Sequence, residues 1–192
     1  MTSVPPTAWL SPDSCENESL KSANSLPFFK MSMKPKIKSF FGASRQYVVT
    51  GASNNPSKFG FKILSWYVSH GLSVVPINPK ESEILGQQVI KSVPEVMKAL
   101  GAKKDLSQYK LSEKDGLSIS FLTPPHITIQ TLKDIAEVPD YKSLIKGLWF
   151  QPGSYDQEAL DTAEALGLID RVVHQEECIL VRGEEGMYSA NL

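Results

Sequence analysis

The residues best suited to binding chemistry lie between Gln46 and Gly60, where an apolar segment gives way to glycine and small polar residues. Tyr47 to Thr50 is typical of a short buried strand that ends at Gly51, and we expect a helix to begin near Ser57. A strand, a glycine turn and a helix N-terminus in this order make an anion site, because unpaired backbone N–H groups and the positive end of the helix dipole converge there. The sequence therefore predicts a phosphate-binding turn.

This turn matches neither of the two common nucleotide-binding motifs. A P-loop has the pattern GxxxxGK followed by Ser or Thr, whereas Lys58 stands between Ser57 and Phe59. A dinucleotide fingerprint has the pattern GxGxxG, and the segment that begins at Gly51 lacks its second glycine. A phosphate can still be held by a serine hydroxyl, by backbone N–H groups and by the lysine. The residues that we expect to contact the ligand here are Gly51, Ala52, Ser53, Asn54, Asn55, Pro56 and Lys58.

A second apolar segment, Leu72 to Asn78, is followed by Pro79 and Lys80. An enzyme that uses NAD usually has Asp or Glu at the end of this strand, where the carboxylate accepts a hydrogen bond from the ribose 2′-OH. A lysine at this position instead favours a phosphorylated ribose, either the 2′-phosphate of NADP or the 3′-phosphate of coenzyme A. We therefore add Asn78, Pro79 and Lys80 to the predicted site and regard NAD as disfavoured.

The elements that must position these residues alternate between strand and helix. Strands are expected over residues 47–50, 72–78, 117–122, 147–150 and 171–173, the last with an extension to 180–181 left open. Helices are expected over 34–45, 57–70, 94–100, 126–136 and 155–166, with a short strand over 88–90 and a lysine-rich surface loop over 101–115. This alternation predicts an α/β fold with a Rossmann-like, doubly wound parallel sheet.

Ligands of such sheets bind beyond the C-terminal ends of the strands. Two further strand ends should therefore join the same rim as the turn after Gly51 and the segment at Lys80. The residues that we expect to contribute from these two ends are Thr123, Pro124, Pro125, Phe150, Gln151 and Pro152.

Several of these segments together resemble the CoA-binding-domain family, small stand-alone Rossmann-like proteins of the YccU type that are similar to the CoA-binding domain of the succinyl-CoA synthetase α subunit. The resemblance covers about residues 38 to 182. It rests on motifs in the same order: Gly51-Ala52-Ser53 with Pro56, Lys58 and Gly60, then Val75-Pro76-Ile77-Asn78-Pro79-Lys80, Gly86, Thr123-Pro124-Pro125 and Trp149-Phe150-Gln151-Pro152-Gly153. The N-terminal segment and the insertion at 101–115 fall outside it.

The resemblance implies roles for particular residues. It places the phosphates of CoA on Ser53 to Pro56, the nucleotide beside Lys80, and another part of the cofactor beside Phe150 to Pro152. The catalytic phosphohistidine of the synthetase lies in a further domain, so the resemblance implies the fold and the ligand without the ligase chemistry.

Residues that could catalyse a reaction are few. Of the three histidines, only His126 is expected near the ligand rim, while His70 and His174 are expected at a helix end and a strand end. Cys178 lies in an apolar context typical of a core cysteine. No Ser-His-Asp order, carboxylate pair or metal cluster stands out, so we predict no catalytic residue and no metal ligand. Two functions remain open: a binding or regulatory module for CoA or acyl-CoA, and an NADP-dependent oxidoreductase.

Length and composition set the remaining expectations. The 192 residues include 41% hydrophobic and 21% charged residues, which suits one globular domain over residues 34–182 between flexible tails at 1–33 and 183–192. A net charge of −1 gives no field that would attract nucleic acid, and no apolar run approaches the roughly 20 residues that span a bilayer. Cys15 and Cys178 suit a reducing compartment with both thiols free. We expect a cytoplasmic protein whose partner is a small nucleotide ligand, with a mitochondrial location left open and protein partners unknown.

Overall fold

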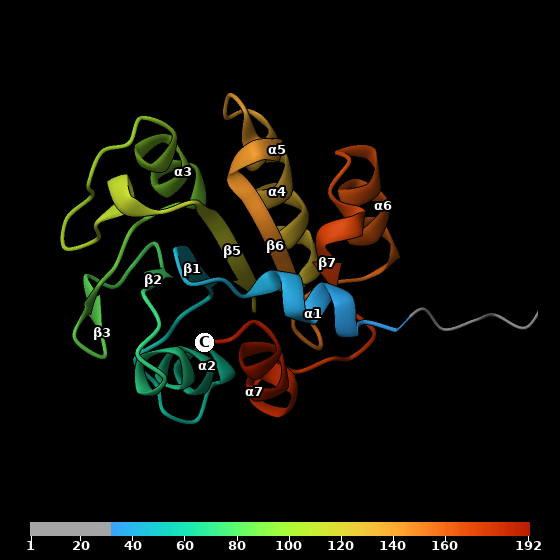
Figure 1. Ribbon diagram of the computed structural model, residues 1–192, viewed down its shortest axis with the longest axis horizontal. Coiled ribbons are helices and arrows are strands. Elements are labelled where there is room, and N and C mark those ends of the chain that lie inside the picture. Colours follow the sequence, from blue (N-terminus) through green and yellow to red (C-terminus); the bar gives the residue numbers. More distant parts are fainter. Residues whose placement is uncertain (1–31) are drawn as a thin grey trace, which may run out of the picture. The chain divides into compact units, whose positions relative to one another are not determined.

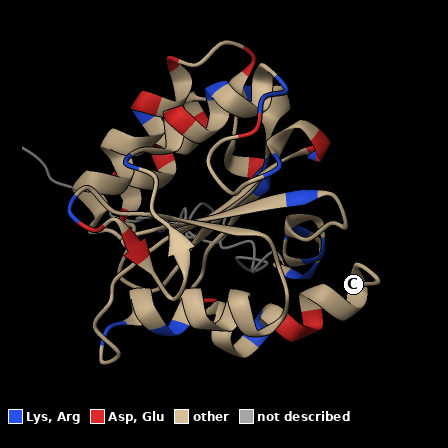
Figure 2. Ribbon diagram, turned by 90° about the vertical axis from the view of Figure 1, so that its left-hand side faces the viewer, with Lys and Arg blue, Asp and Glu red and all other residues tan. Residues whose placement is uncertain are grey.

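The computed structural model describes residues 32–192, and these residues form a five-stranded parallel sheet between two layers of helices (Figures 1 and 2). The strand order is β2-β1-β5-β6-β7, so the chain leaves β1 first toward one edge and then crosses back toward the other. The strands are β1 (Arg45–Thr50), β2 (Val74–Ile77), β5 (Gly116–Phe121), β6 (Ile145–Phe150) and β7 (Val172–Val173). The predicted doubly wound α/β fold is confirmed.

The two helical layers bury opposite faces of the sheet because successive side chains of a strand point to opposite sides. Val48 packs toward α3 (Val93–Gly101), α4 (Pro125–Ala136) and α6 (Gln157–Ala165). Its neighbours Tyr47 and Val49 pack toward α1 (Lys34–Phe40), α2 (Phe59–Ser69) and α7 (Ile179–Ser189). The reversal of strand order between β1 and β5 places a topological switch point, the usual ligand position in such sheets, at their C-terminal ends.

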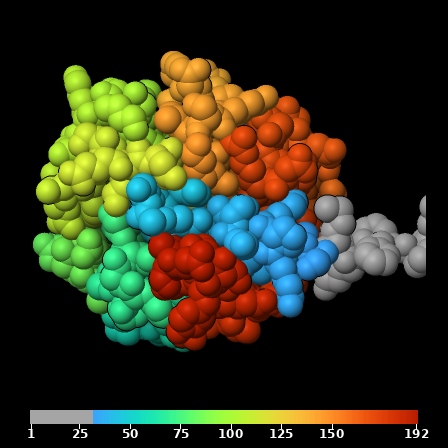
Figure 3. All heavy atoms as spheres, viewed as in Figure 1, coloured from blue at the N-terminus to red at the C-terminus, as the bar shows by residue number. Residues whose placement is uncertain are grey.

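The C-terminal segment differs from the sequence expectation. The last strand ends at Val173, and residues 180–181, left open as its extension, belong to α7. Residues 183–189, expected in a flexible tail, complete that helix, which lies against α1 and α2 (Figure 3). The reason is an apolar side formed by Ile179, Gly183, Gly186 and Met187, which recurs at the helical period and is buried. A Cβ at Gly186 would lie 2.5 Å from the Phe41 ring, so the glycine permits close approach of the two segments.

Other differences are smaller. Of the short strand expected over 88–90, only Gln88 lies in a strand, which belongs to the hairpin of β3 (Glu83–Ile84) and β4 (Gln87–Gln88). Ile90 makes a single bridge to Ile77. The expected surface loop over 101–115 contains the 3₁₀ helix η1 (Leu111–Glu113), with Tyr109 and Leu111 buried.

The remaining elements are α5 (Tyr141–Leu144) and the 3₁₀ helix η2 (Ile169–Arg171). The tail expected over 1–33 lies outside the described residues except for its last two. Of these, Met33 is buried against the α1–α2–α7 layer. None of the helices in residues 32–192 is long and apolar enough to cross a bilayer.

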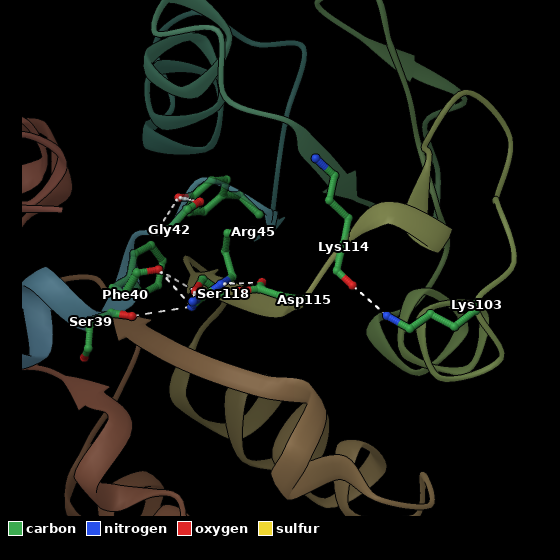
Figure 4. A network of polar contacts seen from close by, with 9 residues as sticks. Ser39, Phe40, Gly42, Arg45, Lys103, Lys114, Asp115 and Ser118 are labelled. Atoms are coloured by element: carbon green, nitrogen blue, oxygen red, sulfur yellow. Dashed lines mark hydrogen bonds and ion pairs between the residues drawn. The ribbon is translucent and has the colours of Figure 1, made fainter. Parts of the chain in front are cut away.

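A polar network around Arg45 lies at the N-terminal ends of the inner strands β1 and β5, opposite the expected site (Figure 4). The Arg45 guanidinium pairs with Asp115 at 3.1 Å and donates to the Ser118 hydroxyl, which in turn donates to the Phe40 carbonyl at 2.5 Å. These bonds connect α1 to the first residues of β1 and β5. Arg45 is only 9% exposed, so its partners offset the cost of burying its charge. The network is therefore structural.

Candidate functional site

The turn after β1 is shaped by two glycines. Gly51 has φ +72°, a conformation that disfavours other residues, and a Cβ there would also lie 3.3 Å from the carbonyl carbon of Leu122. Gly60, in the first turn of α2, lies so close to Gly51 that a Cβ would be 2.1 Å from the Gly51 carbonyl oxygen. These contacts hold the N-terminal end of α2 against the end of β1, with Ala52 buried between them.

The polar part of the turn is organised by its own side chains. Ser53 Oγ accepts from the Asn55 N–H at 3.2 Å, and Asn55 Oδ1 accepts from both the N–H and the hydroxyl of Ser57 at 2.9 and 2.7 Å. The helix begins at Phe59, two residues later than predicted, and Lys58 is its N-cap without a capping side chain. The first-turn N–H groups of α2 are thus left without a side-chain cap, and the residues from Asn54 to Lys58 are exposed.

Asn78 connects the ends of the first two strands. Its Nδ2 donates to the Ala52 carbonyl at 2.8 Å, and its Oδ1 accepts from the N–H groups of Lys80 and Glu81 at 2.7 and 3.1 Å. The same side chain therefore fixes both turns and leaves Lys80 exposed at the rim. The position of Asn78 directly after β2, followed by proline, explains why one residue can serve both strands.

Glu81, the residue after Lys80, adds a carboxylate that the sequence analysis did not consider. Glu81 accepts from Asn54 Nδ2 at 3.0 Å, so the side chain of Asn54 is engaged with the segment after β2. The backbone carbonyl of Glu81 accepts from Lys91 Nζ at 2.7 Å, which brings a second lysine to this end of the sheet. The rim near β2 therefore carries charges of both signs, from Lys80 and Lys91 and from the Glu81 carboxylate.

The ends of β5 and β6 complete the rim. The hydroxyls of Thr123 and Thr128 lie 3.0 Å apart, while Pro124 and Pro125 form the N-cap and the first residue of α4. Phe150 is fully buried, with its ring 5.3 Å from that of Phe121.

Gln151 follows Phe150 at the end of β6. It is 3% exposed, and its Oε1 accepts from the N–H of Ile179 at 3.1 Å. Pro152 is exposed.

Two cavities open along this rim, and each is lined by predicted site residues. One, of about 250 Å³, lies at the ends of β1, β2 and β5. The other, of about 280 Å³, lies between the N-terminal end of α2 and the segments that follow β5 and β6. The predicted residues that line the first cavity are Gly51, Asn78, Pro79 and Thr123, and those that line the second are Gln151 and Pro152. The other predicted residues line neither cavity: Ala52, Ser53, Asn54, Asn55, Pro56, Lys58, Lys80, Pro124, Pro125 and Phe150.

Sequence reasoning missed several lining residues. The first cavity includes Lys91 and Asp134, and the second includes Phe59 and Cys178. Lys91 directly follows the segment expected as a short strand. Its position at a strand end could therefore have indicated that it belongs to the rim. Cys178 was hidden by the apolar residues around it, which suggested a strand core rather than the N-cap of α7.

The histidines differ in their surroundings. His70 contacts the Trp66 carbonyl at 2.7 Å through Nδ1 and Glu184 at 3.7 Å through Nε2. His126 is exposed in the first turn of α4. Burial, and to a lesser degree the charge of Lys36, lower the pKa of His174 below 6.5. Within residues 32–192, no group of three or more His, Cys, Asp or Glu could hold a metal ion.

Comparison with known proteins gives one family. The model of the family described as "CoA binding domain" matches residues 45–184, a span that contains both cavities. No curated protein matches the chain.

Several solved structures are similar. A conserved hypothetical protein from Pyrococcus furiosus is 31% identical with a TM-score of 0.54, covering 72% of this chain and 98% of its own. A hypothetical protein from Pyrococcus horikoshii is 22% identical with a TM-score of 0.59, covering 86% and 99% of the two chains. A dinucleotide-forming acetyl-coenzyme A synthetase from Ca. Korarchaeum cryptofilum, solved with phosphate and ADP, is 23% identical with a TM-score of 0.51, and the match covers 73% of this chain and 27% of the synthetase.

Proposed function

The chain belongs to the CoA-binding domain family, and on that premise we propose that it binds coenzyme A or an acyl-CoA at the C-terminal rim of the sheet, as a binding or regulatory module rather than a catalyst. One observation supports this location above the others. A single cavity within the matched region is lined by residues from three strand ends, represented by Gly51, Asn78 and Thr123. Convergence of strand ends at the switch point is where ligands of such sheets bind.

The phosphates are assigned to the turn from Ser53 to Lys58. The N-terminal end of α2 has no capping side chain, and only the Phe61 N–H of its first turn is taken, by the Lys58 carbonyl at 3.1 Å. The N–H groups of Phe59 and Gly60 and the helix dipole are therefore available to an anion. Lys58 is exposed beside them and adds a positive charge. Because Gly60 allows α2 to pack directly on Gly51, these donors lie at the mouth of the switch point.

The nucleotide end is assigned to the segment after β2. Lys80 and Lys91 supply cations for the 3′-phosphate of CoA. Glu81, held by Asn54, can accept a hydrogen bond from the free 2′-hydroxyl of the same ribose. A phosphorylated ribose therefore has both a cationic and an anionic partner on this side of the rim. NADP, the ligand of the alternative oxidoreductase function, also carries such a ribose and must be separated from CoA by experiment.

Isothermal titration calorimetry of the full chain with CoA, acetyl-CoA, NADP and NAD tests the proposal. We expect CoA or acetyl-CoA to bind with a Kd in the micromolar range or tighter, about −8 kcal/mol, and NAD to give no measurable heat. Binding of NADP without a response to CoA or acetyl-CoA would overturn the proposal in favour of the oxidoreductase. A native mass spectrum of the purified protein adds an independent reading, since a co-purified ligand reports its own mass.

A further inference from the structure

We propose that Cys178 is a thiol–disulfide exchange site that joins the thiol end of CoA to the protein as a mixed disulfide. The site is the second rim cavity, of about 280 Å³. This inference rests on the proposed function, because the nucleotide part of CoA is what would bring its sulfur to this cavity.

The cavity continues directly from the phosphate turn. Phe59, which follows Lys58 in the chain, lines it together with Ile63, one turn further along α2. Leu122, which follows β5, adds an apolar surface next to them. The pantetheine arm of CoA runs from the pyrophosphate to the sulfur, so a pyrophosphate at the turn would direct the arm along this wall. Apolar walls with a few polar groups are typical of small-molecule cavities.

A second, independent feature of the cavity indicates a ligand. Gln151 lines it and is 3% exposed, and its Nε2 has no hydrogen-bond partner among the described residues. The other end of the amide is fixed because Oε1 accepts from the Ile179 N–H. A buried donor without a partner costs about 1–3 kcal/mol, so a ligand that offers an acceptor to this amide would gain stability from it. The amide carbonyls of the pantetheine arm are acceptors of the required kind.

Cys178 provides the reactive atom. It is half-buried and lines the same cavity. Its position is set by the start of α7, where its carbonyl accepts from the N–H groups of Val181 and Arg182, both at 3.0 Å. It is the one cysteine within residues 32–192, and Cys15 lies outside them.

The exchange step balances with CoA disulfide as the co-reactant. The Cys178 thiolate attacks one sulfur of the disulfide, the S–S bond of CoA disulfide breaks, and a new S–S bond joins Sγ to one CoA. The second CoA leaves as a thiolate and takes a proton from water. The disulfide brings the oxidising equivalent, and excess dithiothreitol reverses the step.

Intact-protein mass spectrometry of the full chain after incubation with CoA disulfide, followed by peptide mapping, tests this assignment. We expect one CoA adduct per chain at Cys178, removed by dithiothreitol. Cys178→Ser should abolish the adduct, whereas Cys15→Ser should keep it. Serine is a preferred N-cap residue, so Cys178→Ser should fold, which circular dichroism checks. An adduct that survives in Cys178→Ser and disappears in Cys15→Ser would overturn the assignment.

Pantethine, the disulfide of the same arm without the nucleotide, separates this inference from the proposed function. We expect Cys178 to react at least about tenfold faster with CoA disulfide, which corresponds to about 1.4 kcal/mol of binding. Equal rates with the two disulfides, together with no calorimetric response to CoA, would mean that the proposed function fails. Calorimetric binding of CoA without an adduct at Cys178 would refute the exchange site alone.

Discussion

For single residues, the proposed preference for one nucleotide over another depends on the charges at the rim. Lys80 was predicted to contact a ribose phosphate, and the structure leaves its side chain exposed after the turn fixed by Asn78. The contact itself stays a prediction. Glu81 and Lys91, which the sequence analysis did not use, share this end of the sheet. The sequence could not show this, because Lys91 reaches Glu81 only when the hairpin of β3 and β4 folds back on itself.

Reversing the charge of Lys80 should therefore affect the 3′-phosphate selectively. We expect Lys80→Glu to weaken CoA binding about tenfold, about 1.4 kcal/mol, and to change dephospho-CoA binding much less. Titration calorimetry of both ligands measures the difference. Lys98→Glu, an equal charge change on α3 away from the rim, is the matched control and should leave both affinities unchanged. Equal losses for CoA and dephospho-CoA in Lys80→Glu would contradict the role of Lys80.

For helices and strands, the C-terminal segment is the main correction to the sequence analysis. Predictions of strands and helices from Tyr47 to Leu166 agree with the observed elements within a few residues. The agreement is close because apolar residues recur in this part of the chain with the spacing of a strand or of a helix. Residues 183–192, which were expected as a flexible tail, include two glycines and two glutamates, a composition that suggests a tail. Packing overrides this expectation, because α7 packs against α1 and α2. The helix begins directly after Cys178, its N-cap, which lines the second cavity.

Two neighbouring residues of α7 test its packing. Met187 is 9% exposed, whereas Tyr188 is 73% exposed. We expect Met187→Ala to lower the free energy of unfolding by about 2 kcal/mol, through lost burial and the space left behind. Tyr188→Ala should change it by less than about 0.5 kcal/mol. Urea unfolding followed by circular dichroism measures both. Similar small effects for the two variants would show that α7 does not pack as described.

For the domain as a whole, His174 is a source of pH-dependent stability between neutral and mildly acidic pH. Its imidazole lies beside the Tyr155 ring. Burial lowers the pKa of His174 most, and the positive charge of Lys36 lowers it further. Below pH 6.5 the unfolded chain therefore binds more protons at this residue than the folded chain. Stability from this group is complete above 6.5 and is lost as the pH falls through the folded pKa.

We therefore expect the free energy of unfolding of the wild-type protein to fall between about pH 7 and about pH 5, and that of His174→Gln to fall less. Urea titrations at both pH values measure the two slopes. His126→Gln is the matched control, because His126 is exposed, and it should keep the wild-type slope. A slope in His174→Gln as steep as in the wild type would exclude His174 as the source.

Local order along the chain was enough to predict the alternation of strands and helices and the strand ends that form the rim, whereas the ligand contacts of the predicted residues stay predictions. Apolar period, glycine turns and the residues after each strand are local properties, and the short-range sterics of the backbone act on them directly. The tertiary structure decided what depends on distant segments: the pairing of Asn54 with Glu81, the burial of Phe150 and the helix that places Cys178 in a cavity. These contacts join residues far apart in the chain, so no local pattern records them. The turn after Gly51 was visible in the sequence, but the two rim cavities exist only once the sheet has formed.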